Sequence, residues 1–136
     1  MNTYNGSCHC EAIKFSVTTS IEKIVSCNCS VCTKKGVLHH RVEPEQFNLI
    51  SGEESLALYQ FETKKAKHYF CSQCGIHSFS NPRAAPDKYT INVRCLNDFD
   101  LESESYELVK FDGKNWEKKV AVLNEQLSSN RVAEGI

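Results

Sequence analysis

The sequence lacks an excess of charge of either sign: 16 lysines and arginines stand against 17 aspartates and glutamates, for a net charge of −1 at neutral pH. Without a basic bias, neither nucleic acid nor an anionic membrane surface is an expected partner. No apolar run approaches the roughly 20 residues that span a bilayer. Residues 1–7 have neither a basic start nor an apolar stretch, so we expect no signal peptide and a cytoplasmic location.

Internal repeats and low-complexity linkers are absent too, and the three prolines stand between the elements expected below. A length of 136 residues and a hydrophobic share of 40% are typical of one small globular domain. We expect a single domain over residues 1–127. Residues 128–136 are polar, and we expect them to form a flexible tail.

Short alternating runs predict most of the secondary structure. Ile13, Phe15 and Val17 alternate with polar residues, which predicts a strand with one apolar face. Further strands are expected at residues 37–42, 47–50, 58–61, 67–70, 77–79, 89–93 and 106–111. A helical turn is expected at 30–35, and an amphipathic helix where Trp116, Val120, Leu123 and Leu127 recur at spacings of three and four. The predicted class is mainly β, with antiparallel strands and a short C-terminal helix.

Cysteine is what the sequence has in abundance. Seven of its eight cysteines fall into three tight clusters, at residues 8–10, 27–32 and 71–74. Cysteines so close together pair poorly with each other but converge well on one cation, and cytosolic thiols stay reduced. Structural zinc sites are closed by four ligands, whereas catalytic ones keep one position free. Seven ligands therefore predict one closed and one open Zn²⁺ site.

The closed site is expected from the first and third clusters. Cys71-x-x-Cys74-Gly75 has the form of a zinc knuckle, in which glycine takes a positive φ and backbone amides face the sulfurs. Cys8 and Cys10, two apart in an expected strand, would point to the same side. The intervening His9 would then face solvent. These four cysteines form the predicted structural zinc site.

The middle cluster is the expected catalytic site. Cys27, Cys29 and Cys32 supply three thiolates, which leave one tetrahedral corner for water, a substrate thiol or a carbonyl oxygen. The alternative is closure by a fourth protein ligand, for which the candidates are Cys95, His39, His40 and His77. Cys95 is otherwise interpreted as a small core residue at the end of an apolar strand.

Other side chains near the middle cluster are possible participants. His39 and His40 alternate along an expected strand, so at most one faces the site, either as a general acid or base or as part of a surface strand. Arg83 and Arg94 are candidate contacts for a substrate carboxylate. For Arg83, a solvated surface position is the preferred interpretation.

The order of these motifs resembles a known family. Gly6-Ser7-Cys8-His9-Cys10, Cys27-Asn28-Cys29-Ser30-Val31-Cys32 and Phe70-Cys71-x-x-Cys74-Gly75-Ile76-His77 are similar to the glutathione-dependent formaldehyde-activating enzyme family, which includes the centromere protein V domain. The resemblance continues through Asn92-Val93-Arg94-Cys95-Leu96 and ends near Asn115-Trp116-Glu117. Between residues 34 and 40 the sequence is more similar to the centromere protein V branch.

The resemblance implies a fold, two metal ions and a reaction. The fold is a zinc-binding β-tent of two small antiparallel sheets. By position, Cys8, Cys10, Cys71 and Cys74 hold the structural zinc, and Cys27, Cys29 and Cys32 the catalytic one. The family's named activity joins glutathione and formaldehyde reversibly into S-hydroxymethylglutathione, a carbon–sulfur lyase reaction on a small-molecule thiol adduct. Fold resemblance does not transfer a substrate.

Three functions remain open on the sequence. The leading hypothesis is a zinc-dependent carbon–sulfur lyase acting on a thiol adduct, with the trio's zinc stabilising charge at the reacting sulfur or oxygen. The second is a non-catalytic zinc-binding interaction module, which predicts two closed sites and no pocket. The third is a thiol redox protein that uses Cys71 and Cys74, although such motifs usually accompany a βαβ pattern that this sequence lacks.

Overall fold

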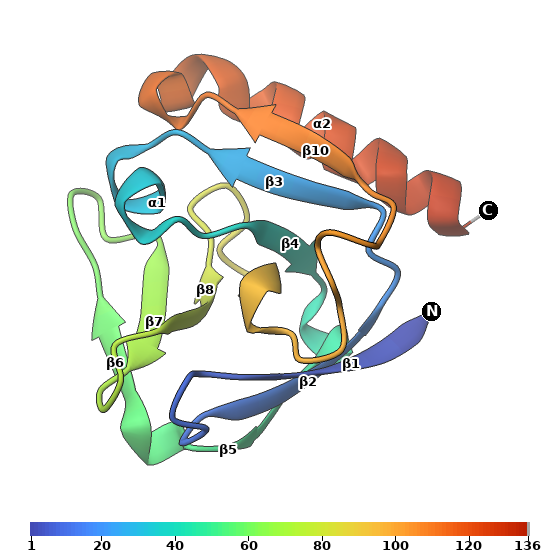
Figure 1. Ribbon diagram of the computed structural model, residues 1–136. Helices are drawn as coiled ribbons and strands as arrows, with labels where there is room; N and C mark the ends of the chain where they lie inside the picture. The colour runs from blue at the N-terminus through green and yellow to red at the C-terminus, as the bar shows by residue number, and fades with distance from the viewer. Residues whose placement is uncertain (136) are drawn as a thin grey trace.

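Over residues 1–135, which the computed structural model describes, the chain forms two β-sheets and two α-helices (Figure 1). Side chains are described to residue 127. The first sheet has three antiparallel strands in the order β1-β2-β5: β1 (Asn2–Ser7), β2 (Lys14–Thr19) and β5 (Phe47–Ser51). Phe15 and Val17 of β2 point into the core and are fully or almost fully buried, as the alternation of the sequence predicts.

The second sheet has seven strands in the order β10-β3-β4-β9-β8-β7-β6. Their bounds are β3 (Lys23–Cys27), β4 (His39–Val42), β6 (Leu56–Tyr59), β7 (Lys67–Cys71), β8 (His77–Asn81), β9 (Tyr89–Asn92) and β10 (Glu107–Phe111). All neighbours are antiparallel except β3 and β10, which pair in parallel. The mainly antiparallel arrangement that the sequence predicts has its one exception among the described strands at this edge. The sequence pattern also missed β1 and β3.

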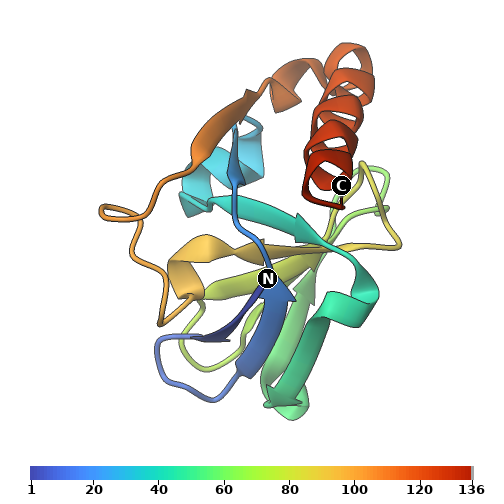
Figure 2. The same cartoon turned by 90° about the vertical axis from the view of Figure 1, so that its right-hand side faces the viewer.

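The main core lies between the two sheets. Phe15 of the first sheet packs with Phe79 of the second, and Ile24 and Ile91 are fully buried beside them. Each such side chain contributes about 1.5–3 kcal/mol by leaving water. Viewed from the side, the first sheet lies at the end of the molecule opposite to α2 (Figure 2). The predicted class, a mainly β fold of two sheets with a C-terminal helix, is confirmed.

The two helices flank the middle cysteines. The predicted turn at 30–35 is α1 (Ser30–Lys35), and α2 (Trp116–Gly135) runs alongside β10 at that edge of the sheet (Figure 1). Leu123 of α2 packs on Val25 and Val109 in a second, smaller core. No helix among the described residues is both long and apolar enough to cross a bilayer. The expected flexible tail falls on residues 128–136, whose side chains lie outside the described part, and its flexibility stays a prediction.

Candidate metal centres

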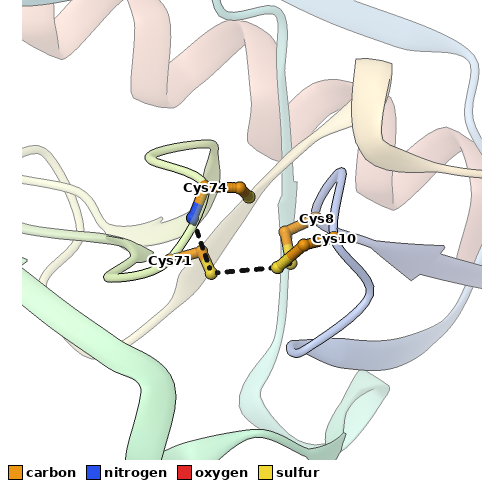
Figure 3. A group of neighbouring side chains, drawn as sticks. All are labelled: Cys8, Cys10, Cys71 and Cys74. Carbon is orange, nitrogen blue, oxygen red and sulfur yellow. Dashed lines mark hydrogen bonds between the residues drawn. The ribbon is translucent and has the colours of Figure 1, made fainter.

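Four cysteines from two distant segments meet at the first centre, the four-cysteine cluster of Cys8, Cys10, Cys71 and Cys74 (Figure 3). The sulfur of Cys10 lies 3.7 Å from that of Cys8 and 3.6 Å from that of Cys71. A tetrahedral ion with metal–sulfur bonds of about 2.3 Å separates its sulfurs by about 3.8 Å. All four sulfurs lie within 4.8 Å of one another, so the cluster fits such an ion.

The Cys71–Cys74 turn has the geometry of a knuckle. The amides of Gln73 and Cys74 each donate to Cys71 Sγ at 3.4 Å, and the Cys74 contact is drawn in Figure 3. Gly75 takes a φ of +79°, a conformation that side chains rarely adopt. Burial opposes the charged form of Cys74, but hydrogen bonds from the backbone of Cys10 and Ile76 outweigh it and lower its pKa to about 6. The turn therefore favours thiolates, the form that binds metal.

Cys8 and Cys10 reach the cluster from a turn, not from a strand as predicted. Strand β1 ends at Ser7, and the Glu11 amide donates back to the Cys8 carbonyl at 3.2 Å. The Ile13 amide donates to Cys8 Sγ at 3.3 Å. A turn of this kind brings both sulfurs to one side by folding the backbone around them. His9 is exposed and outside the cluster, as expected.

The second centre is the cysteine trio of Cys27, Cys29 and Cys32, whose sulfurs also lie within 4.8 Å of one another. Cys27 ends β3, Cys29 is the N-cap of α1 and Cys32 is buried in its first turn. The Cys29 amide donates to Cys27 Sγ at 3.4 Å. Hydrogen bonds from the Cys27 and Cys32 thiols lower the pKa of Cys29 to about 2. One thiolate is thus shared among three sulfurs, and a cation can replace the remaining protons.

No fourth cysteine, histidine or carboxylate joins the trio among the residues that the structure describes. His39 lies nearest, with its Nε2 atom 3.3 Å from Cys32 Sγ, while its Nδ1 atom is buried without a hydrogen-bond partner. His40 points the other way, to Thr19 Oγ1 at 2.9 Å. One histidine of the pair faces the site, as strand alternation predicts. His39 contacts Cys32 alone among the three sulfurs and is not part of the cluster that could hold a metal ion.

The other two candidate ligands lie elsewhere. Cys95, at the end of the short helical turn η3 (Val93–Cys95), donates to the His77 carbonyl at 3.5 Å and belongs to the main core. Burial raises its pKa to about 11, so it is an inert thiol. His77 Nδ1 contacts Lys35 Nζ at 2.9 Å. Cys95 and His77, together with Arg94, line a second hollow beside the four-cysteine cluster.

The trio is held by a turn that sequence reasoning did not connect with it. Because β3 and β10 run in parallel, the segments that follow them emerge at the same end of the two strands. Asn28 Nδ2 donates to Asp112 Oδ1 at 3.0 Å, and the Lys114 amide donates to Asn28 Oδ1 at 3.1 Å. Hydrogen bonds from Asn115 and Asn28 lower the pKa of Asp112 and keep it charged. The Asn28 side chain thus ties the trio's loop to residues 112–115.

Gly113, in this turn, leaves no room for a side chain. A Cβ atom there would lie 2.5 Å from Cys27 Sγ and 2.9 Å from Cys29 Cβ. We expect Gly113→Ala to weaken metal binding at the trio by about 10- to 100-fold, the usual cost of disturbing groups around a ligand. Competition with a chromophoric chelator measures this. Lys114→Ala, in the same turn, is the matched control and should bind metal normally; equal affinity in both variants would contradict the contact.

A cavity of about 660 Å³ opens beside the trio. The three cysteines and His39 line one side, and His68, Phe61, Arg83 and Trp116 line others. The Arg83 guanidinium lies 3.7 Å from the centre of the Trp116 ring and bonds Glu117 Oε1 at 2.7 Å. Arg83 is therefore part of the cavity wall, not the solvated surface residue that the sequence suggested. Its contact with Trp116 spans two segments that no local sequence pattern connects.

These features define a small β protein with two clusters of thiols that could each hold a metal ion, one of four cysteines and one of three, the smaller facing a cavity. Residues 3–111 match the family model described as glutathione-dependent formaldehyde-activating enzyme. The match covers well over half of the chain, which therefore belongs to this family. A crystal structure of a Rhodobacter sphaeroides protein is also similar, with a TM-score of 0.70 and 30% identity over 77% of this chain and 99% of that one.

Proposed function

We propose that this protein is a zinc-dependent carbon–sulfur lyase that cleaves or forms a small-molecule thiol adduct, with S-hydroxymethylglutathione as the leading candidate. The observation that carries the proposal is the trio: three thiols converge within 4.8 Å, lack a fourth protein ligand among the described residues and open on a cavity. Zinc catalytic sites keep such a free position. The family's description, which names glutathione and formaldehyde, supports the same reaction.

Two Zn²⁺ ions per chain belong to this proposal. The four-cysteine cluster would hold one as a structural ion, because it offers a full set of tetrahedral thiolate ligands. The trio would hold the other as the catalytic ion. All-thiolate donor sets favour zinc over magnesium or calcium, which prefer oxygen. When bound at the trio, zinc supplies Lewis-acid stabilisation of a substrate thiolate or oxygen.

The reaction transfers one proton from the hydroxyl oxygen of the adduct to its sulfur. Cleaving R–S–CH₂–OH breaks the carbon–sulfur bond, takes the hydroxyl proton and leaves formaldehyde and a thiolate, which the proton then neutralises. His68 lines the cavity, and its burial lowers its pKa, so the ring is neutral near pH 7 and can accept that proton. The walls formed by Phe61 and Trp116 shield the reacting atoms from water.

The rival functions are less well supported. An interaction module predicts a closed second site and no pocket, whereas the trio has three ligands and a cavity. A redox role requires Cys71 and Cys74 to be free, whereas Cys71 Sγ lies 3.6 Å from Cys10 Sγ in a four-thiol cluster. We also propose that residues 1–127 form one domain and that the protein works in the cytoplasm, where thiol clusters stay reduced.

The direct test combines metal analysis with turnover. Protein purified under reducing conditions is expected to carry two zinc ions per chain and to release formaldehyde from S-hydroxymethylglutathione. Protein stripped at the trio with a mild chelator should lose the activity and regain it when zinc is added. Two bound zinc ions with no turnover of any thiol adduct would contradict the lyase and favour the interaction module.

A further inference from the structure

One wall of the cavity comes from outside the segment that matches the family. The match ends at residue 111, whereas the cavity is also lined by Lys114, Trp116, Glu117 and Lys118. These residues belong to the turn η4 (Gly113–Asn115) and the start of α2. This wall lies beside the trio, so its side chains bear on which thiol adduct the cavity accepts.

The charges around the cavity favour an anion. Apart from the thiols of the trio, the described lining residues include four cationic side chains and two acidic ones, Glu62 and Glu117. The cationic four are Arg41, Arg83, Lys114 and Lys118. A hollow lined mainly by one sign of charge concentrates ligands of the opposite sign.

Arg83 is the cation best prepared to bind that anion. Its guanidinium carbon lies over the Trp116 ring, 3.7 Å from the ring centre, and this contact limits the directions in which its donors can project. Its Nε atom is buried and has no hydrogen-bond partner among the described residues. Its Nη2 atom bonds Glu117, whose side chain is 79% exposed against 27% for Arg83. An ion pair with so exposed a carboxylate contributes little and is readily exchanged.

We propose that Arg83 is a specificity-determining residue that binds a carboxylate of the substrate, so that the enzyme selects adducts of acidic thiols over neutral ones. The Glu117 carboxylate marks a place that a substrate carboxylate takes when it displaces this side chain. The planar guanidinium can then use Nε and Nη2 as a two-point fork. The inference rests on the lyase function proposed above, and it names the chemical class of the thiol.

Two matched adducts test this selection. The hydroxymethyl adducts of N-acetylcysteine and of N-acetylcysteine amide share the reacting group and differ in the carboxylate. Arg83→Gln should raise KM for the acid adduct by about 10- to 100-fold, the range for losing hydrogen bonds to a charged group. It should leave KM for the amide and both kcat values unchanged. Arg94→Gln, an exposed arginine away from this cavity, is the control and should change neither.

Two further variants separate charge from geometry. Glu117→Gln frees the guanidinium and should lower KM for the acid adduct only. Arg83→Lys keeps the charge without the planar fork and should fall between wild type and Arg83→Gln. Thermal unfolding must be unchanged in each variant. An equal loss on both adducts in Arg83→Gln, or no loss on the acid, would overturn the assignment.

Binding can be read without turnover, because Trp116 is the single tryptophan of the chain and lies beneath Arg83. N-acetylcysteine should change its fluorescence saturably in wild type but not in Arg83→Gln, and the amide should bind about tenfold or more weakly. If the fluorescence titration shows tighter binding of the acid than of the amide while neither adduct is cleaved, the carboxylate-binding role of Arg83 is supported and the lyase proposal is contradicted. If both adducts are cleaved equally well without such a difference, the lyase stands and the carboxylate site fails.

Discussion

Replacing Cys71 by serine is expected to unfold the protein. Cys71 is fully buried and joins the two segments of the four-cysteine cluster, with Cys10 Sγ 3.6 Å away and two amides donating to its sulfur. The binding free energy of a structural zinc, about 10–16 kcal/mol, counts as folding free energy. A domain of this size is stable by only about 5–15 kcal/mol. Losing one of four ligands therefore removes most of what keeps the chain folded.

Circular dichroism melts and zinc analysis measure this, and Cys95→Ala supplies the matched control. Cys95 is also a buried cysteine, 7% exposed, but lies outside both clusters. Its replacement should cost about 1–2 kcal/mol, as for an ordinary small core truncation, and should leave both metals bound. A Cys71→Ser protein with a normal melting temperature and two zinc ions would show that the four-cysteine cluster has no structural role.

What the sequence predicted well was local. The apolar faces of β2, the bounds of α1 and the positive φ at Gly75 each depend on neighbours a few residues away. The division of seven cysteines into groups of four and three also emerged from spacing and count alone, and the same sulfurs meet in the structure. Thiols are scarce and chemically distinctive, so their clusters indicate shared ligands even when 61 positions separate Cys10 from Cys71.

What the sequence could not predict depends on pairing between distant segments. The parallel pairing of β3 with β10 has no local pattern, yet it places Gly113 against Cys27 and Asn28 against Asp112. The same pairing starts α2 beside the cavity, where Trp116 supports Arg83. The contact of Asp112 and Gly113 with the trio's segment likewise requires the tertiary fold. The sequence therefore did not predict the shape of the cavity, although it predicted the three cysteines of the trio that line it.

Replacing Cys29 by serine is expected to abolish activity and remove one zinc ion per chain while the fold persists. The trio comes from one continuous segment, so its metal does not connect distant parts of the chain as the four-cysteine cluster does. The main core contains Cys8 and Cys71 but no member of the trio, and Cys27 packs at the margin of the second, smaller core. Loss of a direct ligand should reduce turnover by more than about 100-fold, since disturbing second-sphere partners alone costs about 10- to 100-fold.

The contrast between the two cysteine variants is the decisive measurement. Lys34→Ala, an exposed change in α1 that lies outside the cavity lining, should keep two zinc ions and full turnover, which separates loss of a ligand from disturbance of the segment. If Cys29→Ser unfolds as readily as Cys71→Ser, the trio is a second structural site, and this result favours the non-catalytic interaction module. If it folds, carries one zinc ion and still cleaves the adduct, chemistry must lie elsewhere in the cavity. Only a folded, inactive protein with one metal fits a closed centre that holds the fold and an open centre that performs the reaction.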